Sequence, residues 1–318
     1  MNETDKDPDI WADWLLHKRH ADDPAFESLV RADALAYADR VLDLAQIQPG
    51  MTLLDVGSGD GVVAFRAIER IGPDLKVVLT DISRELLAKA QAEARRREVQ
   101  QQCTFWWCAA DSLHDIPDAS VDVVTTRAVL AYVADKPAAL REFMRVLRVG
   151  GRISLAEPIF QYAAIETTAL RQMVERSDEG SQKELLRLIH RWKASQYPDT
   201  LAGIAERPMT NFSERTLWEF VRACGFADMH MELHVDMQPS AVTSWELLLD
   251  LSPHPLAPTL GEILAEQFSR QERAILEQAL RPTLESSSPM STNYIAYLSA
   301  RRCVRQLPSR ELPVQHLA

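Results

Sequence analysis

The stretch LLDVGSGDG, residues 53–61, combines two apolar residues and an aspartate with three glycines in five positions. The glycines lie between an expected strand and an expected helix. Because glycine has no Cβ atom, the turn can be sharp and a ligand can lie against its backbone. At the carboxyl edge of an open parallel sheet, such a turn is where nucleotide-like ligands bind. The G-x-G-x-G spacing and the carboxylates of Asp55 and Asp60 disfavour a pyrophosphate and favour a ligand with an ammonium or sulfonium group.

Short β-branched runs alternate with helical patterns from residue 51 to residue 158. Strict alternation implies crossover connections, and therefore a parallel sheet with helices on both faces. Strands are expected in MTLLDVG, LKVVLTD, CTFWWCAAD, SVDVVTTR and GGRISLAEP, and helices over 61–71, 83–97 and 137–147. The continuous apolar character of these strands indicates burial on both sides, and CTFWWC is interpreted as a buried strand.

The alternation of strand and helix patterns stops after residue 158. Residues 159–207 contain no strand signal, and SQKE at 181–184 and SRQE at 269–272 are candidate capping boxes. FSERTLWEFVRACGF predicts a helix that ends at Gly225, followed by a strand near 226–235 and a final strand at 291–300. The predicted organisation is an N-terminal helical lid or cap (1–45), a cofactor-binding core (46–158), a helical insertion that covers the substrate (159–210), the completion of the core (211–302) with a second helical insertion (236–290), and a tail (303–318).

Composition limits the classes of partner. The chain has 318 residues, 46% of them hydrophobic, and a net charge of −11, which argues against general affinity for nucleic acid. No apolar stretch approaches the length that spans a bilayer, and the acidic start does not resemble a signal peptide, so the chain is predicted to be cytoplasmic. Four cysteines without a CxxC pair favour neither a zinc site nor a disulfide framework.

Two further aspartates follow the expected strands. Asp81 ends the second strand, 20 residues after Gly61, where a carboxylate can accept both hydroxyl protons of a ribose. Asp111 ends the third strand, where an adenine amino group could donate to it. An aspartate at such a position is alternatively a helix cap, but three of them at consecutive strand ends along one edge favour a nucleoside site.

These residues resemble the class I S-adenosylmethionine-dependent methyltransferases. LLDVGSGDG is similar to the family's first motif, LTDIS to the second, AADSL to the third, VDVVTTRAVLAYV to the fourth, and LREFMRVLRVGGRISLAEP to the segment after it. The resemblance covers residues 48–158 and resumes at FSERTLWEFVRACGF and at the final strand. The most similar group contains ubiquinone/menaquinone C-methyltransferases and arsenite methyltransferases. It implies a Rossmann-like seven-stranded sheet with an antiparallel last strand, helices on both faces, and S-adenosyl-L-methionine as cofactor.

The resemblance also implies site residues. The cofactor would be held by Asp55, Gly57, Ser58, Gly59, Asp60, Gly61, Asp81, Ile82, Ala110, Asp111, Ser112 and Arg127. Arg127 follows the fourth strand, so it would face the methyl group and position the reactants by clamping an anion; a structural ion pair is the alternative. Candidates for the substrate pocket are Tyr132, Glu157, Tyr162 and His190.

Methyl transfer from a sulfonium is an in-line displacement that needs alignment and exclusion of water more than an acid or a base. TTRAVLAY lacks the N/D-P-P-Y type motif of nucleic-acid amino-methyltransferases, so a small organic acceptor is expected. Two alternatives stay open: a non-catalytic methyltransferase-like binding protein and a nicotinamide-dependent oxidoreductase. Arsenite is disfavoured because no suitable cysteine arrangement is evident. The amphipathic DIWADWLLHKRH, residues 9–20, is either a lid whose Arg19 reaches the cofactor carboxylate or a helix packed permanently on the body.

Overall fold

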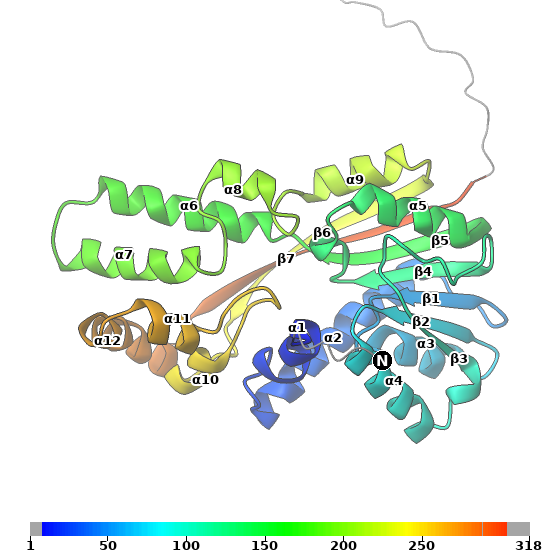
Figure 1. The fold of residues 1–318 in the computed structure, drawn as a ribbon, viewed down its shortest axis with the longest axis horizontal. Coiled ribbons are helices and arrows are strands. Elements are labelled where there is room, and N and C mark those ends of the chain that lie inside the picture. The colour runs from blue at the N-terminus through cyan, green and yellow to red at the C-terminus, as the bar shows by residue number, and fades with distance from the viewer. Residues whose placement is uncertain (1–7, 288, 304–318) are drawn as a thin grey trace, which may run out of the picture.

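Seven strands form one sheet in the order β3-β2-β1-β4-β5-β7-β6 (Figure 1). The structure, a computed structural model, describes residues 8–287 and 289–303. β7 runs antiparallel to both of its neighbours, and the other pairs are parallel, so the predicted sheet is confirmed. The strands are β1 Thr52–Val56, β2 Lys76–Asp81, β3 Cys103–Trp107, β4 Val121–Arg127, β5 Leu147–Pro158, β6 Ala227–Pro239 and β7 Met290–Arg301.

Helices cover both faces of the sheet because successive strand residues point to opposite sides. Leu53 and Leu54 are fully buried, yet they belong to two different hydrophobic clusters. The cluster of Leu53 includes residues of α2 (Pro24–Ala45), α3 (Val62–Ile71) and α4 (Arg84–Arg96). The cluster of Leu54 includes residues of α5 (Lys136–Val146) and α9 (Glu214–Ala223).

The two predicted insertions combine into one helical lobe beyond the sheet (Figure 1). Its helices are α6 Gln161–Arg176, α7 Ser181–Ala194, α8 Leu201–Glu206, α10 Trp245–Asp250, α11 Leu260–Gln267 and α12 Arg270–Ser287. Leu188 and Trp192 of α7 share a buried cluster with Trp245, Ile263 and Leu276 of the second insertion. β6 and β7, of 13 and 12 residues, extend from the sheet toward this lobe.

The N-terminal region divides into two parts. α2 packs on the sheet with Ala38 and Val41 fully buried, so it is a layer of the core rather than part of a lid. The short α1 (Ile10–Asp13) and the following π-helix (Trp14–Lys18) instead cross the carboxyl edge of the sheet. Within the described residues 8–45, this segment lies over the carboxyl edge of the sheet, and one side of α2 also lines a cavity through Phe26, Val30, Asp33 and Tyr37.

Local expectations differ from the structure at two places. CTFWWC is an edge strand rather than a buried one, because β3 has β2 as its single neighbour, and Trp107 is 52% exposed. SQKE is not a capping box, because α7 has Gly180 at its N-cap and no capping hydrogen bond from a side chain. The capping box predicted for SRQE is confirmed by reciprocal hydrogen bonds between Ser269 and Glu272.

Within the described ranges, no helix is both long and apolar enough to cross a bilayer. Apart from Cys303, the predicted tail lies outside the described residues.

Candidate active site

A cavity of about 290 Å³ lies where β1, β2, β3 and β4 end, and it is called the edge cavity below. Strand order brings these ends together, because parallel neighbours present their carboxyl termini to one edge. The sequence-predicted residues that line it are Gly57, Gly59, Asp81, Ile82, Ala110, Asp111, Arg127 and Tyr132. Trp11, Trp14 and Leu15 of the N-terminal segment close it from the other side.

The glycine turn after β1 forms one wall of the edge cavity. Gly57 and Gly59 have φ of +63° and +56°, a region that side chains disfavour, and a Cβ at Gly57 would overlap the side chain of Val129. The turn is tied to β2 through Asp81, whose Oδ2 accepts from Gly59 N at 2.8 Å and whose Oδ1 accepts from Ser83 N at 2.8 Å. Gly61 takes the N-cap position of α3 with φ +87°.

Asp55 lies beneath this turn as a buried carboxylate. Its Oδ1 accepts from Thr125 Oγ1 at 2.9 Å, whereas its Oδ2 has no hydrogen-bond partner among the described residues. Burial raises the pKa of Asp55 to about 7, and the Thr125 hydrogen bond and the charge of Arg127 oppose that rise only in part. Ser58 Oγ is also buried without a hydrogen-bond partner among the described residues. Asp55 Oδ2 and Ser58 Oγ can therefore each make a further hydrogen bond.

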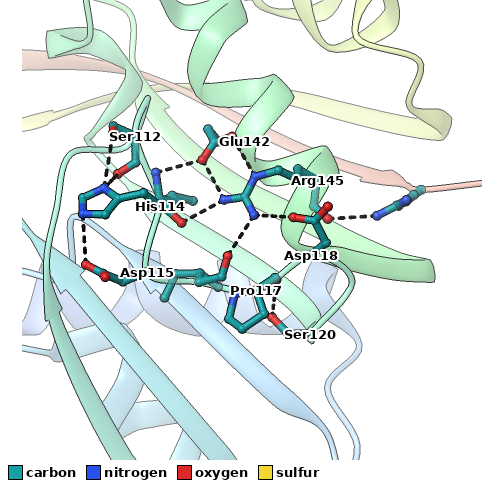
Figure 2. Close-up of polar contacts among 11 residues, drawn as sticks. Ser112, His114, Asp115, Pro117, Asp118, Ser120, Glu142 and Arg145 are labelled. Carbon is teal, nitrogen blue, oxygen red and sulfur yellow. Dashed lines mark hydrogen bonds and ion pairs between the residues drawn. The ribbon is translucent and has the colours of Figure 1, made fainter.

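The loop after β3 carries Ala110, Asp111 and Ser112. Glu142 and Arg145 of α5 hold this loop (Figure 2), and neither of the two lines the edge cavity. Arg145 of α5 donates to Leu113 O at 2.8 Å and to Ile116 O at 2.9 Å, while Glu142 accepts from Leu113 N at 2.9 Å. Ala110 and Asp111 line the cavity, and the exposed Ser112 turns to His114 instead. Asp60 lies on the far side of the turn, 3.9 Å from Arg31.

Glu157 has another role than the predicted contact with substrate. Its carboxylate is fully buried, accepts from Thr126 Oγ1 at 2.6 Å, and accepts from the backbone N–H groups of Val129 and Ala131 at 3.0 and 3.2 Å. It therefore fixes the loop after β4, the loop that presses Val129 against Gly57. Glu157 is not among the residues that line either cavity at this edge.

A second cavity of about 620 Å³ lies between the sheet edge and the helical lobe, and it is called the lobe cavity. It shares Trp14, Arg127 and Tyr132 with the edge cavity and adds Arg19, and residues of α7 extend its wall. Burial lowers the pKa of Arg19 to about 10, and the like charge of Arg127 lowers it further.

The remaining substrate candidates lie elsewhere. Tyr162 stacks on Tyr294 at 4.2 Å between ring centroids and hydrogen-bonds Glu214, and His190 pairs with Asp199 at 3.0 Å. Neither Tyr162 nor His190 lines either cavity, so of the four predicted residues the structure brings Tyr132 alone to the site.

Comparison with known proteins finds similar sequences for part of the chain. Residues 47–201 match the model described as a methyltransferase domain. This part, a little under half of the chain, is therefore similar to a methyltransferase domain. The chain is 40% identical over 122 residues to nocamycin O-methyltransferase of Saccharothrix syringae, covering 38% of this chain and 43% of that protein. It is 39% identical over 113 residues to the ubiquinone/menaquinone biosynthesis C-methyltransferase UbiE of Xanthomonas oryzae pv. oryzae, covering 36% and 44%. The chain thus matches less than half the length of these curated relatives.

Solved structures share the fold over a larger part of the chain. The YcgJ protein of Bacillus subtilis superposes with a TM-score of 0.52 and 15% identity, covering 85% of this chain and 99% of that one. The [4+2]-cyclase SpnF superposes with a TM-score of 0.50 and 19% identity, covering 91% and 89%. At such identities the likeness concerns the fold alone.

Residues that the sequence did not single out complete the walls of the two cavities. Leu86, Cys108 and Val129 add apolar surface to the edge cavity, and Trp192, Lys193 and Tyr197 line the lobe cavity. The motifs predicted the sheet edge because each follows a strand. Trp192 and Lys193 lie in α7, whose apolar spacing is typical of ordinary packing, and Tyr197 follows that helix. Only the packing of the lobe against the sheet brings these residues to a cavity.

Proposed function

We propose that the chain is an S-adenosyl-L-methionine-dependent methyltransferase that transfers a methyl group to a small organic acceptor. The arrangement that carries the proposal is the edge cavity, in which the glycine-rich turn after β1 meets the carboxylates of Asp81 and Asp111. The acceptors named for the two relatives belong to those proteins, and they support a small molecule here by similarity.

The residues present fit this cofactor. Two buried polar atoms under the glycine turn, Asp55 Oδ2 and Ser58 Oγ, have no partner among the described residues, and a ligand amino group offers the donors that a carboxylate oxygen accepts. In the proposed assignment Asp81 accepts from the ribose hydroxyls, Asp111 from the adenine amine, and Ile82 packs on the adenine. The cofactor supplies an electrophilic methyl group on a sulfonium.

The chain's own part in the reaction is to bind, orient and exclude water. Arg127 and Tyr132 line both cavities and so stand where cofactor and acceptor would meet. Burial raises the pKa of Tyr132, so its hydroxyl stays protonated and acts as a donor rather than a base. Trp11 covers this point, with its ring 5.1 Å from that of Tyr132.

Titration calorimetry with S-adenosylmethionine, S-adenosylhomocysteine and NAD tests the proposal. We expect the two adenosyl ligands to bind, NAD not to bind, and Asp81→Asn to weaken binding about tenfold or more, because hydrogen bonds to a charged acceptor are lost. The matched control is Asp74→Asn, an exposed position at the opposite end of β2.

Methyl transfer itself is read out by mass spectrometry across a panel of phenols, carboxylic acids and amines. NAD binding would favour the oxidoreductase alternative. Binding of both adenosyl ligands without a methylated product would favour the non-catalytic protein. This distinction matters because a protein described as a cyclase has the same fold.

A further inference from the structure

The lobe cavity contains cations without partners, although the chain as a whole is acidic. Arg19, Arg127 and Lys193 all line it. Within the described part of the chain, the side chain of none of them makes a hydrogen bond or an ion pair; Arg19 lies over the Trp14 ring at 5.5 Å, and Lys193 Nζ over the Trp192 ring at 4.1 Å. Two carboxylates, Asp33 and Glu166, also line the cavity, so its lining carries a small net positive charge, which favours anions.

Lys193 stands apart from the two arginines because it belongs to the helical lobe. It lies near the end of α7 and lines the lobe cavity but not the edge cavity. Burial lowers the pKa of Lys193, and the charge of Glu166 opposes that effect. Glu166 is exposed at the wall of the same cavity and makes no ion pair with Lys193. An anion in the lobe cavity would therefore gain an ammonium that the protein itself leaves unpaired.

Tyr197 supplies a second donor beside Lys193. Its backbone N–H donates to Lys193 O at 2.9 Å, so the two residues are one helical turn apart, and both line the lobe cavity. Burial raises the pKa of Tyr197, so its hydroxyl remains a donor, and it makes no hydrogen bond to the described residues. An ammonium and a hydroxyl together match the acceptor pattern of a carboxylate.

A row of aromatic rings connects this end of the lobe cavity to the edge cavity. Ring centroids are 5.1 Å apart for Trp11 and Tyr132, 6.0 Å for Tyr132 and Phe160, and 6.3 Å for Phe160 and Tyr197. Aromatic walls favour planar apolar bodies through stacked and edge-to-face contacts. The row ends at Tyr197, four residues from Lys193, so the aromatic wall of the lobe cavity leads to an ammonium group.

We propose that the acceptor is a planar organic anion whose negative group binds Lys193 and Tyr197 while its body lies along the aromatic row toward Arg127. The inference rests on the proposed function, since it assigns the acceptor of that same site. Arg127, which lines both cavities, is left for orienting the reacting end, and Arg19, which lines the lobe cavity, is left for the carboxylate of the cofactor.

Calorimetry on the protein saturated with S-adenosylhomocysteine tests this assignment with two probes, 6-hydroxy-2-naphthoate and its neutral carboxamide. We expect the carboxylate to bind about tenfold tighter, a difference of about 1.4 kcal/mol. Lys193→Met should remove most of that preference, and Lys193→Arg should keep most of it. The control is Lys183→Met, a lysine of the same helix that pairs with Glu179 at 2.8 Å.

Three results would overturn the proposal: equal affinity of the wild type for both probes, a preference that survives in Lys193→Met, or no binding of either probe at millimolar concentration. The affinity of each variant for S-adenosylhomocysteine is measured first, and it should be unchanged. If the wild type bound no S-adenosylhomocysteine, the proposed function would fail as well; intact binding of that ligand with any of the three results contradicts the acceptor assignment alone.

Discussion

Asp55 combines burial and charge in a way that ties folding to ligand binding. Burial raises its pKa to about 7, far above the usual value of an aspartate near 3.9. At a pH between these two pKa values, the Asp55 carboxyl is therefore protonated in the folded state and ionised in the unfolded state. The contribution of the protonated Asp55 to the free energy of unfolding is fully present below the pKa of the unfolded state. It is lost as pH rises through the pKa of the folded state. A cationic ligand beside Asp55 would lower its pKa in the folded state, because the positive charge favours the ionised carboxylate over the protonated form.

Asp55→Asn is expected to flatten the pH dependence of stability between pH 5 and pH 7. One linked proton contributes a slope of at most about 1.4 kcal/mol per pH unit, and the uncharged amide removes it. Urea unfolding at a series of pH values measures the slope, with Asp74→Asn as the control. A slope identical to that of the wild type would show that Asp55 is already ionised in the folded protein.

At the level of elements, the sheet edge could be predicted from sequence and the lobe could not. The glycines at 57 and 59, Asp81 and Asp111 each follow a strand with a clear apolar pattern, so strand order alone gathers them. Glu157 was assigned to the substrate because it also follows a strand, but its side chain turns inward to the loop after β4. A strand end fixes the position of a residue, whereas backbone N–H groups nearby decide where a carboxylate points.

The loop after β3 is held in place by hydrogen bonds from α5, and no sequence motif predicted these contacts. Arg145 bonds two carbonyl groups of this loop, so Arg145→Met should loosen it and lower stability by about 1–3 kcal/mol. Affinity for S-adenosylhomocysteine should fall several-fold, because Ala110 and Asp111 lose their fixed position. Arg141→Met is the control, since Arg141 is an exposed residue of the same helix. Unchanged affinity and unchanged hydrogen exchange over residues 110–118 would contradict this role.

At the scale of the whole molecule, the N-terminal segment joins the carboxyl edge of the sheet to the helical lobe. Asp9 Oδ2 accepts from Ser83 Oγ at 2.6 Å on the sheet side, and Trp14 Nε1 donates to Ser252 O at 2.9 Å on the lobe side. Sequence predicted an amphipathic segment here but not its partners, because both contacts are made over more than seventy positions in the chain. Amphipathic spacing identifies an apolar face and leaves open what covers it.

Occupation of the edge cavity should order this segment, because Trp11, Trp14 and Leu15 form part of the wall. We expect slower hydrogen exchange over residues 9–20 when S-adenosylhomocysteine is added, with β6 at the opposite end of the sheet unchanged. Trp14→Phe keeps an aromatic ring but removes the donor to Ser252, so it should reduce this protection and weaken binding several-fold. Equal exchange with and without the ligand, in a protein that binds it, would mean that the segment is a fixed layer and not a lid.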